Sequence, residues 1–428
     1  MHVNVENEAA APTRSSIPII LLCGVISVID GFDTQAIGYA AGHIIDDWAL
    51  DDGMAGTFFS TGFVGAILGG LIAGYFFRLL GRRRVLSFWL VWVGLASFSN
   101  ALANDYVTLL IIRLIGGVGL GALIPILIST VTEAASGKAR GRAISLVVAG
   151  APIGGVVAGA AYGMISIELG WRSIFVIGGI LPLLMVPLVF LTIPPGLSRQ
   201  EDRVPQEELE SAPAKPRGSA LRETLRAIAG LFRGGRALAT TTIMLTAFCG
   251  TLLGITLMNW TPLLLKSLAF SEEMSAAGGV ALNVGALLSI FGFGYLLDRT
   301  GSGWVVSIGF LFGFALLLFS GIVPLGIDLR IVVMGLIGFF AIGPNSGVWY
   351  LVSSSYSGDE VVDATSIGLV VARIGGAVGP IMVGWLVAQG LGTQMVFGVL
   401  SLMAALAALG AALFLVLAKR RLASSPST

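Results

Sequence analysis

The chain has 428 residues, of which 56% are hydrophobic and 11% are charged, and its formal net charge is +1. A soluble globular protein carries about 25% charged residues, so this composition excludes a chain that is surrounded by water. The small net charge also argues against a surface that binds nucleic acid.

Twelve apolar stretches follow one another along the chain. A helix of about 20 apolar residues crosses the hydrocarbon core of a bilayer, and the 59 glycines suit membrane helices, whose backbones approach closely. The predicted helices cover residues 17–41, 54–77, 85–103, 107–131, 143–166, 173–194, 238–265, 276–297, 303–324, 330–355, 364–388 and 393–418. The sequence therefore predicts an all-α membrane protein with twelve transmembrane helices.

One polar stretch interrupts this series. Residues 195–237 combine several prolines with charged side chains, which favours a linker between two six-helix halves. The expected organisation is a cytoplasmic tail at 1–16, an N-terminal half at 17–194, the cytoplasmic linker at 195–237, a C-terminal half at 238–418 and a second cytoplasmic tail at 419–428.

Two sequence patterns recur at nearly the same offset, which indicates that the two halves are related. The matching sets are Gly74 and Gly81 with Gly294 and Gly301, and Ile153-Gly154-Gly155 with Ile374-Gly375-Gly376. The offset relates the second predicted helix to the eighth and the fifth to the eleventh. Parallel repeats of this kind place a substrate site near the middle of the bilayer, between the halves.

Basic residues gather on one side of the predicted membrane. Most of the 25 Lys and Arg residues fall in the tails, the linker and the loops of one side, whereas Arg172, Lys266 and Arg330 fall on the other. Since Lys and Arg concentrate in cytoplasmic loops, this pattern predicts that both termini are cytoplasmic. We expect a monomeric multi-pass protein of the inner membrane, surrounded by the lipid bilayer.

Cysteine and histidine are scarce. With only Cys23, Cys249, His2 and His43, the chain has no spacing typical of a disulfide framework, a zinc site or a histidine-based catalytic triad. A phosphate-binding loop is also missing from the sequence. We therefore expect no enzyme activity, no metal, no cofactor and no nucleic-acid partner.

The narrowest motif in the chain is Asp30-Gly31-Phe32-Asp33-Thr34-Gln35 in the first predicted helix. It resembles the first-helix signature of the aromatic acid:proton symporter family, which belongs to the major facilitator superfamily. Further matches are the Gly-rich stretch from Arg113 to Gly121 with Pro125, then Glu133, Trp171-Arg172, Asp298 to Gly301, and Arg373-Ile374-Gly375 with Pro380. The resemblance covers almost the whole chain outside the tails and the linker.

The resemblance implies a proton-coupled importer of small aromatic carboxylates that works by alternating access in the major facilitator fold. Two rival functions remain open. One is proton-coupled export of small amphipathic compounds, since the stretch from Gly150 to Gly155 weakly resembles the fifth-helix motif of the superfamily's antiporters. The other is a paralogue that does not transport.

The loops that the resemblance assigns to a cytoplasmic gate depart from the family pattern. Arg78 stands at a position that is usually acidic, and Asp363 stands where a basic residue is usual. We interpret the two changes as a reciprocal charge swap that pairs Arg78 with Asp363; the alternative is independent drift and a weakened gate. The expected gate residues are Arg78, Arg82, Arg83, Glu133, Arg140, Arg142, Asp298, Arg299 and Asp363, with Asp298 facing Arg140 or Arg142.

Three charged residues fall deep inside the first and fourth predicted helices. Asp30 and Asp33 are three residues apart and share one helical face, and Arg113 lies at a depth similar to that of Asp33. Charges inside a membrane are functional candidates because they are unfavourable there. Burial favours a protonated carboxylate, and a nearby arginine favours the ionised form. We expect Asp30 and Asp33 to couple proton movement to substrate binding at Arg113; the alternative is a static ion pair.

Polar and aromatic residues of other helices are candidates for substrate contact. Arg373, inside the eleventh predicted helix, could hold a carboxylate or close the inner gate; the alternative is a cation satisfied by helix carbonyls. The remaining candidates are Gln35, Tyr39, Asn259, Trp260, Asn345, Trp349 and Tyr350, which could enclose an aromatic ring and bond its substituents. Trp260 is equally compatible with an anchor at the membrane surface.

Overall fold

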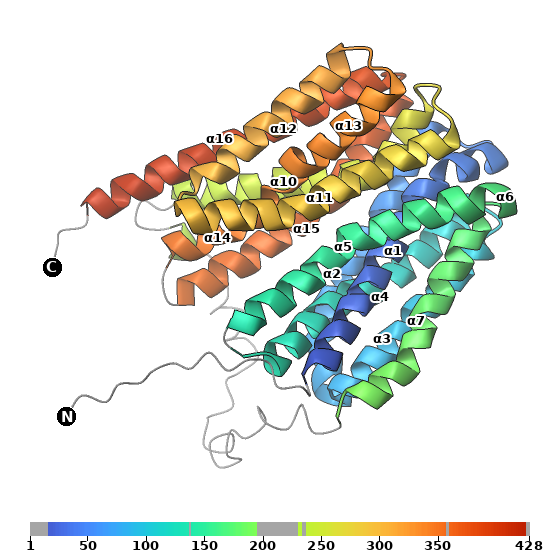
Figure 1. Ribbon diagram of the computed structural model, residues 1–428, viewed down its shortest axis with the longest axis horizontal. Coiled ribbons are helices and arrows are strands. Elements are labelled where there is room, and N and C mark those ends of the chain that lie inside the picture. Colours follow the sequence, from blue (N-terminus) through green and yellow to red (C-terminus); the bar gives the residue numbers. More distant parts are fainter. Residues whose placement is uncertain (1–15, 137, 195–229, 233–236, 357–358, 425–428) are drawn as a thin grey trace.

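The computed structural model describes residues 16–136, 138–194, 230–232, 237–356 and 359–424. Within these ranges the chain is helical, and no β-strand occurs in them. Figure 1 shows long helices that run roughly along one another from one end of the molecule to the other. The prediction of an all-α fold is confirmed. Most of the predicted linker lies outside the described residues.

The helices follow the chain in two series. The first consists of α1 (Ile17–Trp48), the short 3-10 turn η1 (Asp52–Met54), α2 (Ala55–Leu80), α3 (Arg82–Ala101), α4 (Tyr106–Ala134), α5 (Lys138–Ala161), the π-helical turn η2 (Tyr162–Ser166), α6 (Ile167–Leu169) and α7 (Arg172–Thr192). The second consists of α10 (Ala237–Lys266), α11 (Glu272–Thr300), α12 (Trp304–Ile322), α13 (Ile327–Ile337), the π-helical turn η3 (Gly338–Ile342), α14 (Asn345–Ser355), α15 (Asp359–Ala388) and α16 (Thr393–Ser424).

One helix that the sequence analysis predicted to be continuous is interrupted in the structure. The expected single helix at 330–355 is divided into α13, the turn η3 and α14, with a break at Gly343 and Pro344. Proline has no backbone N–H to donate within a helix, and its ring clashes with the preceding turn. Such breaks and π-turns are common where a helix lines a functional region. The first helix also runs farther than the predicted end at residue 41, because α1 continues to Trp48.

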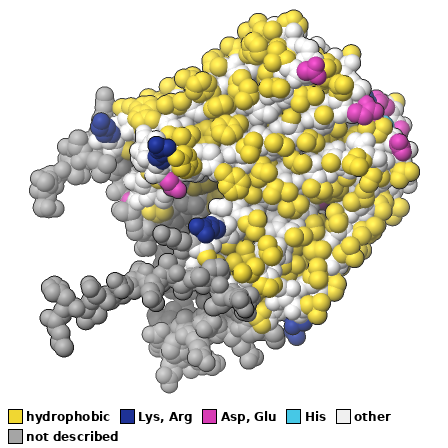
Figure 2. Space-filling view, in the orientation of Figure 1, with side chains coloured by type: hydrophobic (Ala, Val, Ile, Leu, Met, Phe, Trp, Pro, Cys, Tyr) yellow, Lys and Arg dark blue, Asp and Glu magenta, His cyan; other side chains and the backbone are white. Residues whose placement is uncertain are grey.

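The surface of the helical body suits a bilayer. Eleven segments among the described residues are long and apolar enough to cross a membrane. Arginine, serine and asparagine lower the mean hydropathy of α3, which has the length of a span but is not among the eleven. Figure 2 shows hydrophobic side chains over the middle of the molecule and charged side chains toward its two ends.

The two ends carry opposite charge, and we name them by it. The acidic end carries Asp46, near the end of α1, and Glu272, at the start of α11; the basic end carries Arg82, at the start of α3, and Arg299, near the end of α11. Each long helix runs between these two ends. The names carry no assumption about which end faces the cytoplasm.

Each series packs into its own bundle. In the first, α1 packs on α5, α2 on α4 and α3 on α7; in the second, α10 packs on α15 and α16, and α12 on α16. The bundles contact each other chiefly through α2 with α15 and α5 with α11. These two contacts are equivalent under the sequence repeat, which relates α2 to α11 and α5 to α15. The interface therefore has the pseudo-symmetry that the repeat implies.

Small residues let the bundles approach near the acidic end. A Cβ atom added to Gly56 of α2 would lie 2.4 Å from the carbonyl oxygen of Pro380 on α15. A Cβ atom added to Gly38 of α1 would lie 2.7 Å from the carbonyl oxygen of Asn259 on α10. Both distances are too short for any side chain, so glycine is required for this backbone contact.

Candidate functional site

A cavity of about 270 Å³ lies between the two bundles. Its lining residues come from α1, α2, α4 and α5 on one side and from α10 and α15 on the other: Asp30, Gly31, Thr34, Gln35, Phe63, Ala66, Leu120, Gly121, Ile124, Ala151, Thr251, Ile255, Met258, Asn259, Arg373 and Gly376. The wall is mainly apolar, with a few polar groups and two charged ones. This composition is typical of a site for a small organic molecule.

Asp30 reaches the cavity because α1 lies directly on α5. A Cβ atom added to the next residue, Gly31, would lie 2.6 Å from both Cα and the carbonyl oxygen of Ala151 on α5. The side chain of Asp30 is 9% exposed, and its Oδ1 has no hydrogen-bond partner in the described part of the chain. A buried carboxylate oxygen without a donor is an unfavourable place for negative charge.

Asp33 and Arg113 lie away from the cavity, inside the first bundle. A Cβ atom added to Gly178 on α7 would lie 3.4 Å from Oδ1 of Asp33, and one added to Gly62 on α2 would lie 3.1 Å from Nη2 of Arg113. The two charges interact electrostatically, but among the described residues no salt bridge joins them. The structure thus brings Asp33 and Arg113 into one neighbourhood and separates them from the lining of the cavity.

Gln35 connects the bundles through amide hydrogen bonds. Its Nε2 donates to the carbonyl oxygen of Ala151 at 2.9 Å, and its Oε1 accepts from Nδ2 of Asn283 on α11 at 2.8 Å. Tyr39, one turn farther along α1, donates to the carbonyl oxygen of Gly155 at 3.0 Å. Asn283 was missed in the sequence analysis. The signal that could have found it is a lone asparagine in the otherwise apolar predicted helix 276–297.

Arg373 is the basic residue of the cavity. It extends from α15 across the interface, and its Nη1 donates to the carbonyl oxygen of Ala66 on α2 at 2.9 Å. A guanidinium group presents several donors in one plane and binds carboxylates through two parallel hydrogen bonds. The position of Arg373 in an apolar-walled cavity therefore suits an anionic ligand.

The amides of α10 and α14 complete the polar part of the site. Asn259 lines the cavity, and its Nδ2 donates to the carbonyl oxygen of Ile255 at 2.9 Å. Asn345 lies behind the wall and donates to Thr251, a lining residue, at 3.2 Å. The side-chain oxygens of both amides are buried and have no partner in the described part of the chain.

The four aromatic candidates, Tyr39, Trp260, Trp349 and Tyr350, lie outside the cavity lining. Trp260 is fully buried, donates to the carbonyl oxygen of Pro380 at 3.3 Å and packs edge-on against Phe59 of α2 at 5.4 Å. It therefore packs against both α15 and α2, and it is not exposed at a membrane surface. Trp349 and Tyr350, on α14, are half-buried and are not among the lining residues.

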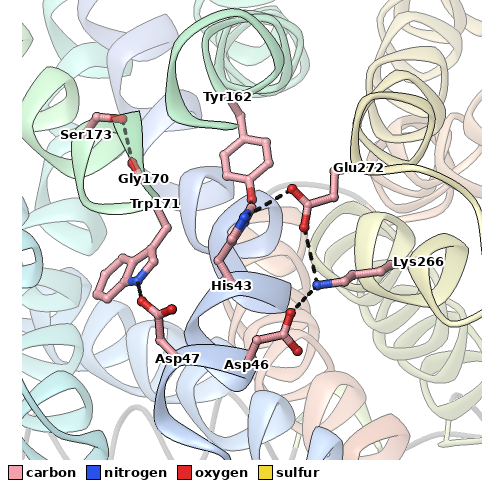
Figure 3. A network of polar contacts seen from close by, with 9 residues as sticks. All are labelled: His43, Asp46, Asp47, Tyr162, Gly170, Trp171, Ser173, Lys266 and Glu272. Carbon is pink, nitrogen blue, oxygen red and sulfur yellow. Dashed lines mark hydrogen bonds and ion pairs between the residues drawn. The ribbon is translucent and has the colours of Figure 1, made fainter. Parts of the chain in front are cut away.

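A cluster of charged residues joins the bundles at the acidic end (Figure 3). Lys266, at the end of α10, contacts Asp46 of α1 at 2.6 Å and Glu272 of α11 at 3.4 Å. His43 of α1 contacts Glu272 through Nε2 at 3.1 Å and Tyr162 through Nδ1. We call His43, Asp46, Lys266 and Glu272 the acidic-end cluster. Two of its contacts, Lys266 with Asp46 and His43 with Glu272, cross the interface.

A neighbouring set of contacts stays within the first bundle. Trp171 donates to Asp47 at 2.7 Å (Figure 3). Arg172 lies 3.9 Å from the same carboxylate. The sequence analysis named none of these acidic-end residues as a gate. The acidic stretch around Asp46 opposite the isolated Lys266 was the signal available.

At the basic end the expected gate residues make their contacts within single bundles. Arg82 pairs with Glu133 and donates to Ser129 at 3.3 Å, so α3 is joined to α4. Arg83 lies over the ring of Phe190 at 4.3 Å. These contacts fix the first bundle and do not reach the second.

Two further expected gate residues, Arg140 and Arg299, also bond within their own bundles. Arg140 donates to the carbonyl oxygen of Thr132 at 3.1 Å, and Arg299 donates to Tyr295 at 2.7 Å. Asp298 and Arg142 are exposed, and in the described part of the chain no ion pair joins Asp298 to Arg140 or Arg142. Asp363 is half-buried, and the side chain of Arg78 lies outside the described residues, so the predicted pair of these two residues stays a prediction.

Two helical bundles that span a membrane and enclose a cavity at their interface define a membrane transport protein. A family model described as Major Facilitator Superfamily matches residues 23–380. The chain belongs to this superfamily, and it is a transporter and not an enzyme. The family predicted from the helix-1 motif is confirmed at this level, and so is the fold.

Several known proteins resemble the chain over nearly its whole length. A 3-(3-hydroxy-phenyl)propionate transporter of Escherichia coli strain K12 is 34% identical over 427 residues, covering 96% of each chain. A gallate transporter of Pseudomonas putida is 27% identical, covering 91% of this chain and 90% of its own. The crystal structure of a D-xylose-proton symporter has a TM-score of 0.71 at 19% identity, covering 92% of this chain and 96% of that one. This last similarity concerns the fold.

Proposed function

We propose that the protein is a proton-coupled symporter that imports small aromatic carboxylates across the inner membrane. Relatives at 34% and 27% identity transport a hydroxyphenylpropionate and gallate, and both compounds combine a carboxylate with an aromatic ring. The observation that carries the proposal is the cavity, where Asp30 on one side and Arg373 on the other are the two charged groups among apolar and uncharged polar lining residues.

The cavity divides the recognition of such a substrate between three kinds of group. Arg373 binds the carboxylate, the apolar residues Phe63, Leu120 and Ile255 contact the ring, and the amides bind ring substituents. We assign carboxylate binding to Arg373 and not to Arg113, because only Arg373 lines the cavity. Asp33 and Arg113 then hold α1 against α4 inside the first bundle.

The coupling between proton binding and substrate binding follows from the charge of Asp30. An ionised Asp30 repels a carboxylate that enters the same cavity, and a protonated Asp30 does not. Substrate and proton therefore bind together, and each favours the other. Release of the proton on the cytoplasmic side restores the repulsion and expels the substrate.

Transport by this scheme requires that each end opens in turn. By the distribution of Lys and Arg, the acidic end faces outside and the basic end faces the cytoplasm, with both termini cytoplasmic. The acidic-end cluster holds the outer side closed in this conformation. Rocking of the halves 17–194 and 238–418 around the central site exchanges the two openings.

The test is uptake of a radiolabelled panel of benzoate, hydroxybenzoates and hydroxyphenylpropionates into cells that express the protein, with and without a protonophore. Asp30→Asn carries a neutral group that mimics the protonated acid. We expect this variant to lose accumulation but to keep exchange of internal for external substrate, because exchange needs no release of the proton. Asp47→Asn, at the acidic end, is the matched control and should accumulate substrate normally.

The other outcomes are equally informative. Accumulation that persists in Asp30→Asn or under the protonophore would refute proton coupling through this residue. If no panel compound enters, and the protein instead lowers the cellular content of toxic amphiphiles, the protein is an exporter.

A further inference from the structure

The guanidinium group of Arg373 rests on the opposite bundle. Its Nη1 donates to the carbonyl oxygen of Ala66 on α2 at 2.9 Å, and no carboxylate of the described residues lies within ion-pairing distance. A cation in an apolar-walled cavity is thus held by a single neutral main-chain oxygen. Charge-assisted hydrogen bonds to carboxylates are stronger than those to neutral acceptors, so Arg373 is available to an anion.

The residue that makes this contact possible is Gly70. Within an α-helix the carbonyl of residue 66 accepts from the N–H of residue 70, so a side chain at position 70 stands beside that oxygen. A Cβ atom added to Gly70 would lie 2.2 Å from Nη1 of Arg373, 3.1 Å from Cζ and 3.3 Å from Nη2. Any residue other than glycine therefore displaces the guanidinium group from the Ala66 oxygen.

Other tight glycines of α2 meet different groups: Cβ atoms added to Gly65 and Gly69 would lie 2.2 Å and 1.9 Å from the carbonyl oxygens of Leu114 and Val118 on α4. A Cβ atom added to Gly74, one turn farther along the same helix, would meet nothing within 4 Å. Position 70 lies against the cationic group of the cavity, and position 74 does not.

We propose that Gly70 and the carbonyl of Ala66 form a resting site that positions Arg373, and that the substrate carboxylate competes with this site. The inference rests on the proposed function, because it takes the substrate to be an anion. Ala66 lies on α2 and Arg373 on α15, so their bond ties the two halves together. When a carboxylate captures the guanidinium group, this tie is broken, and binding of substrate is thereby linked to movement of the halves. Gly70 is a positioning residue that acts through Arg373.

The experiment compares the wild-type protein with Gly70→Ala and Gly74→Ala, purified and in cells. We measure the Kd for 3-(3-hydroxyphenyl)propionate and benzoate, and the KM and Vmax of uptake. Loss of one competing charge-assisted bond should lower Kd and KM in Gly70→Ala by about tenfold. Vmax should fall, because the carbonyl oxygen of Ala66 no longer competes with the substrate carboxylate for Arg373. The bound substrate is then released more slowly. Gly74→Ala should leave all three values unchanged.

A merely structural role for Gly70 has a different signature. It would lower Vmax or the amount of protein while Kd and KM stayed at the wild-type values, and this result would overturn the proposal. So would equal effects of Gly70→Ala and Gly74→Ala. Gly70→Ser, which adds a larger group at the same place, should reproduce the fall in Kd if the resting site exists.

Failure of the proposed function is recognised separately. If the wild-type protein binds no aromatic carboxylate, hydrogen–deuterium exchange of the ligand-free protein decides about the resting site. Faster exchange in α15 around Arg373 in Gly70→Ala than in Gly74→Ala supports it. Equal exchange in the two variants overturns it.

Discussion

The acidic and basic ends of the molecule both carry many charges, but they use them differently. At the acidic end, Lys266 contacts Asp46 and His43 contacts Glu272, and each of these contacts joins one bundle to the other. At the basic end, the pair of Arg82 with Glu133 joins two helices of the same bundle. The number of charges at an end therefore does not tell whether that end is closed. What matters is whether the two residues of an ion pair come from the same bundle or from different bundles.

This difference indicates the conformation of the transporter. Cross-interface ion pairs and the close approach at Gly56 hold the acidic end shut. The bundles separate toward the basic end, as the helix axes in Figure 1 show. With the orientation proposed above, the molecule is closed to the outside.

The largest expected effect comes from reversing the charge at the centre of the acidic-end cluster. Lys266→Glu places a third carboxylate beside Asp46 and Glu272, and like charges at this distance repel by several kcal/mol. Closure of the acidic end becomes unfavourable, and we expect the initial rate of substrate uptake to fall more than tenfold, by this estimate. The measurement is uptake at saturating substrate in cells with matched protein levels.

Two further variants test whether the lower uptake rate of Lys266→Glu results from the loss of its ion pair across the interface. Adding Asp46→Lys to Lys266→Glu restores an opposite-charge pair and should recover part of the lost rate. Arg172→Glu reverses a charge at the same end, but the Arg172 contact with Asp47 stays within one bundle. This control should reduce uptake far less, and an equal loss would show that the distinction between the two kinds of contact is wrong.

An intermediate effect on the uptake rate is expected from residues that would meet when the basic end closes. If Arg78 and Asp363 form the predicted swapped pair, Arg78→Asp places two acids together and should slow uptake several-fold by like-charge repulsion. Asp363→Arg added to it restores a pair and should return most of the rate. Additive damage by the two substitutions would mean that the positions drifted independently.

The smallest effect on transport, but a measurable one on stability, is expected within the first bundle. Glu133→Gln leaves the buried charge of Arg82 without its ionic partner. Replacing a charge-assisted bond of a buried group by a neutral one costs on the order of 1 kcal/mol of folding stability, so the melting temperature of the purified protein should fall while KM stays unchanged. Asp298→Asn, an exposed basic-end control, should leave the melting temperature as it is. A raised KM in Glu133→Gln would place this residue in the transport pathway and not only in the packing of α3 on α4.

Much of the architecture could be predicted because it depends on local composition. The apolar stretches fixed the approximate position of every long helix, since the bilayer imposes both length and hydrophobicity. The break at Pro344 and the extension of α1 to Trp48 were missed. Hydropathy does not register a helix break within an apolar stretch, and it drops at His43 and Asp46 although α1 continues through them.

The candidate site was predictable in its residue types and not in their arrangement. A charged residue in an apolar stretch is visible in the sequence, so Asp30, Asp33, Arg113 and Arg373 could all be singled out. Which of them lines the cavity depends on how each helix is rotated and on what packs against it. The contact of α1 with α5 at Gly31 places Asp30 at the cavity, whereas Asp33 points toward α7 and Arg113.

The sequence by itself determined the class of protein, because hydrophobicity, charge bias and the helix-1 motif are properties of short segments. Only the tertiary structure decided which charges meet. Lys266 and Asp46 are 220 residues apart in the chain, and Arg373 and Ala66 are 307 apart. Such pairs form only where the two bundles pack together, and no local pattern encodes the rotation and depth at which they do so.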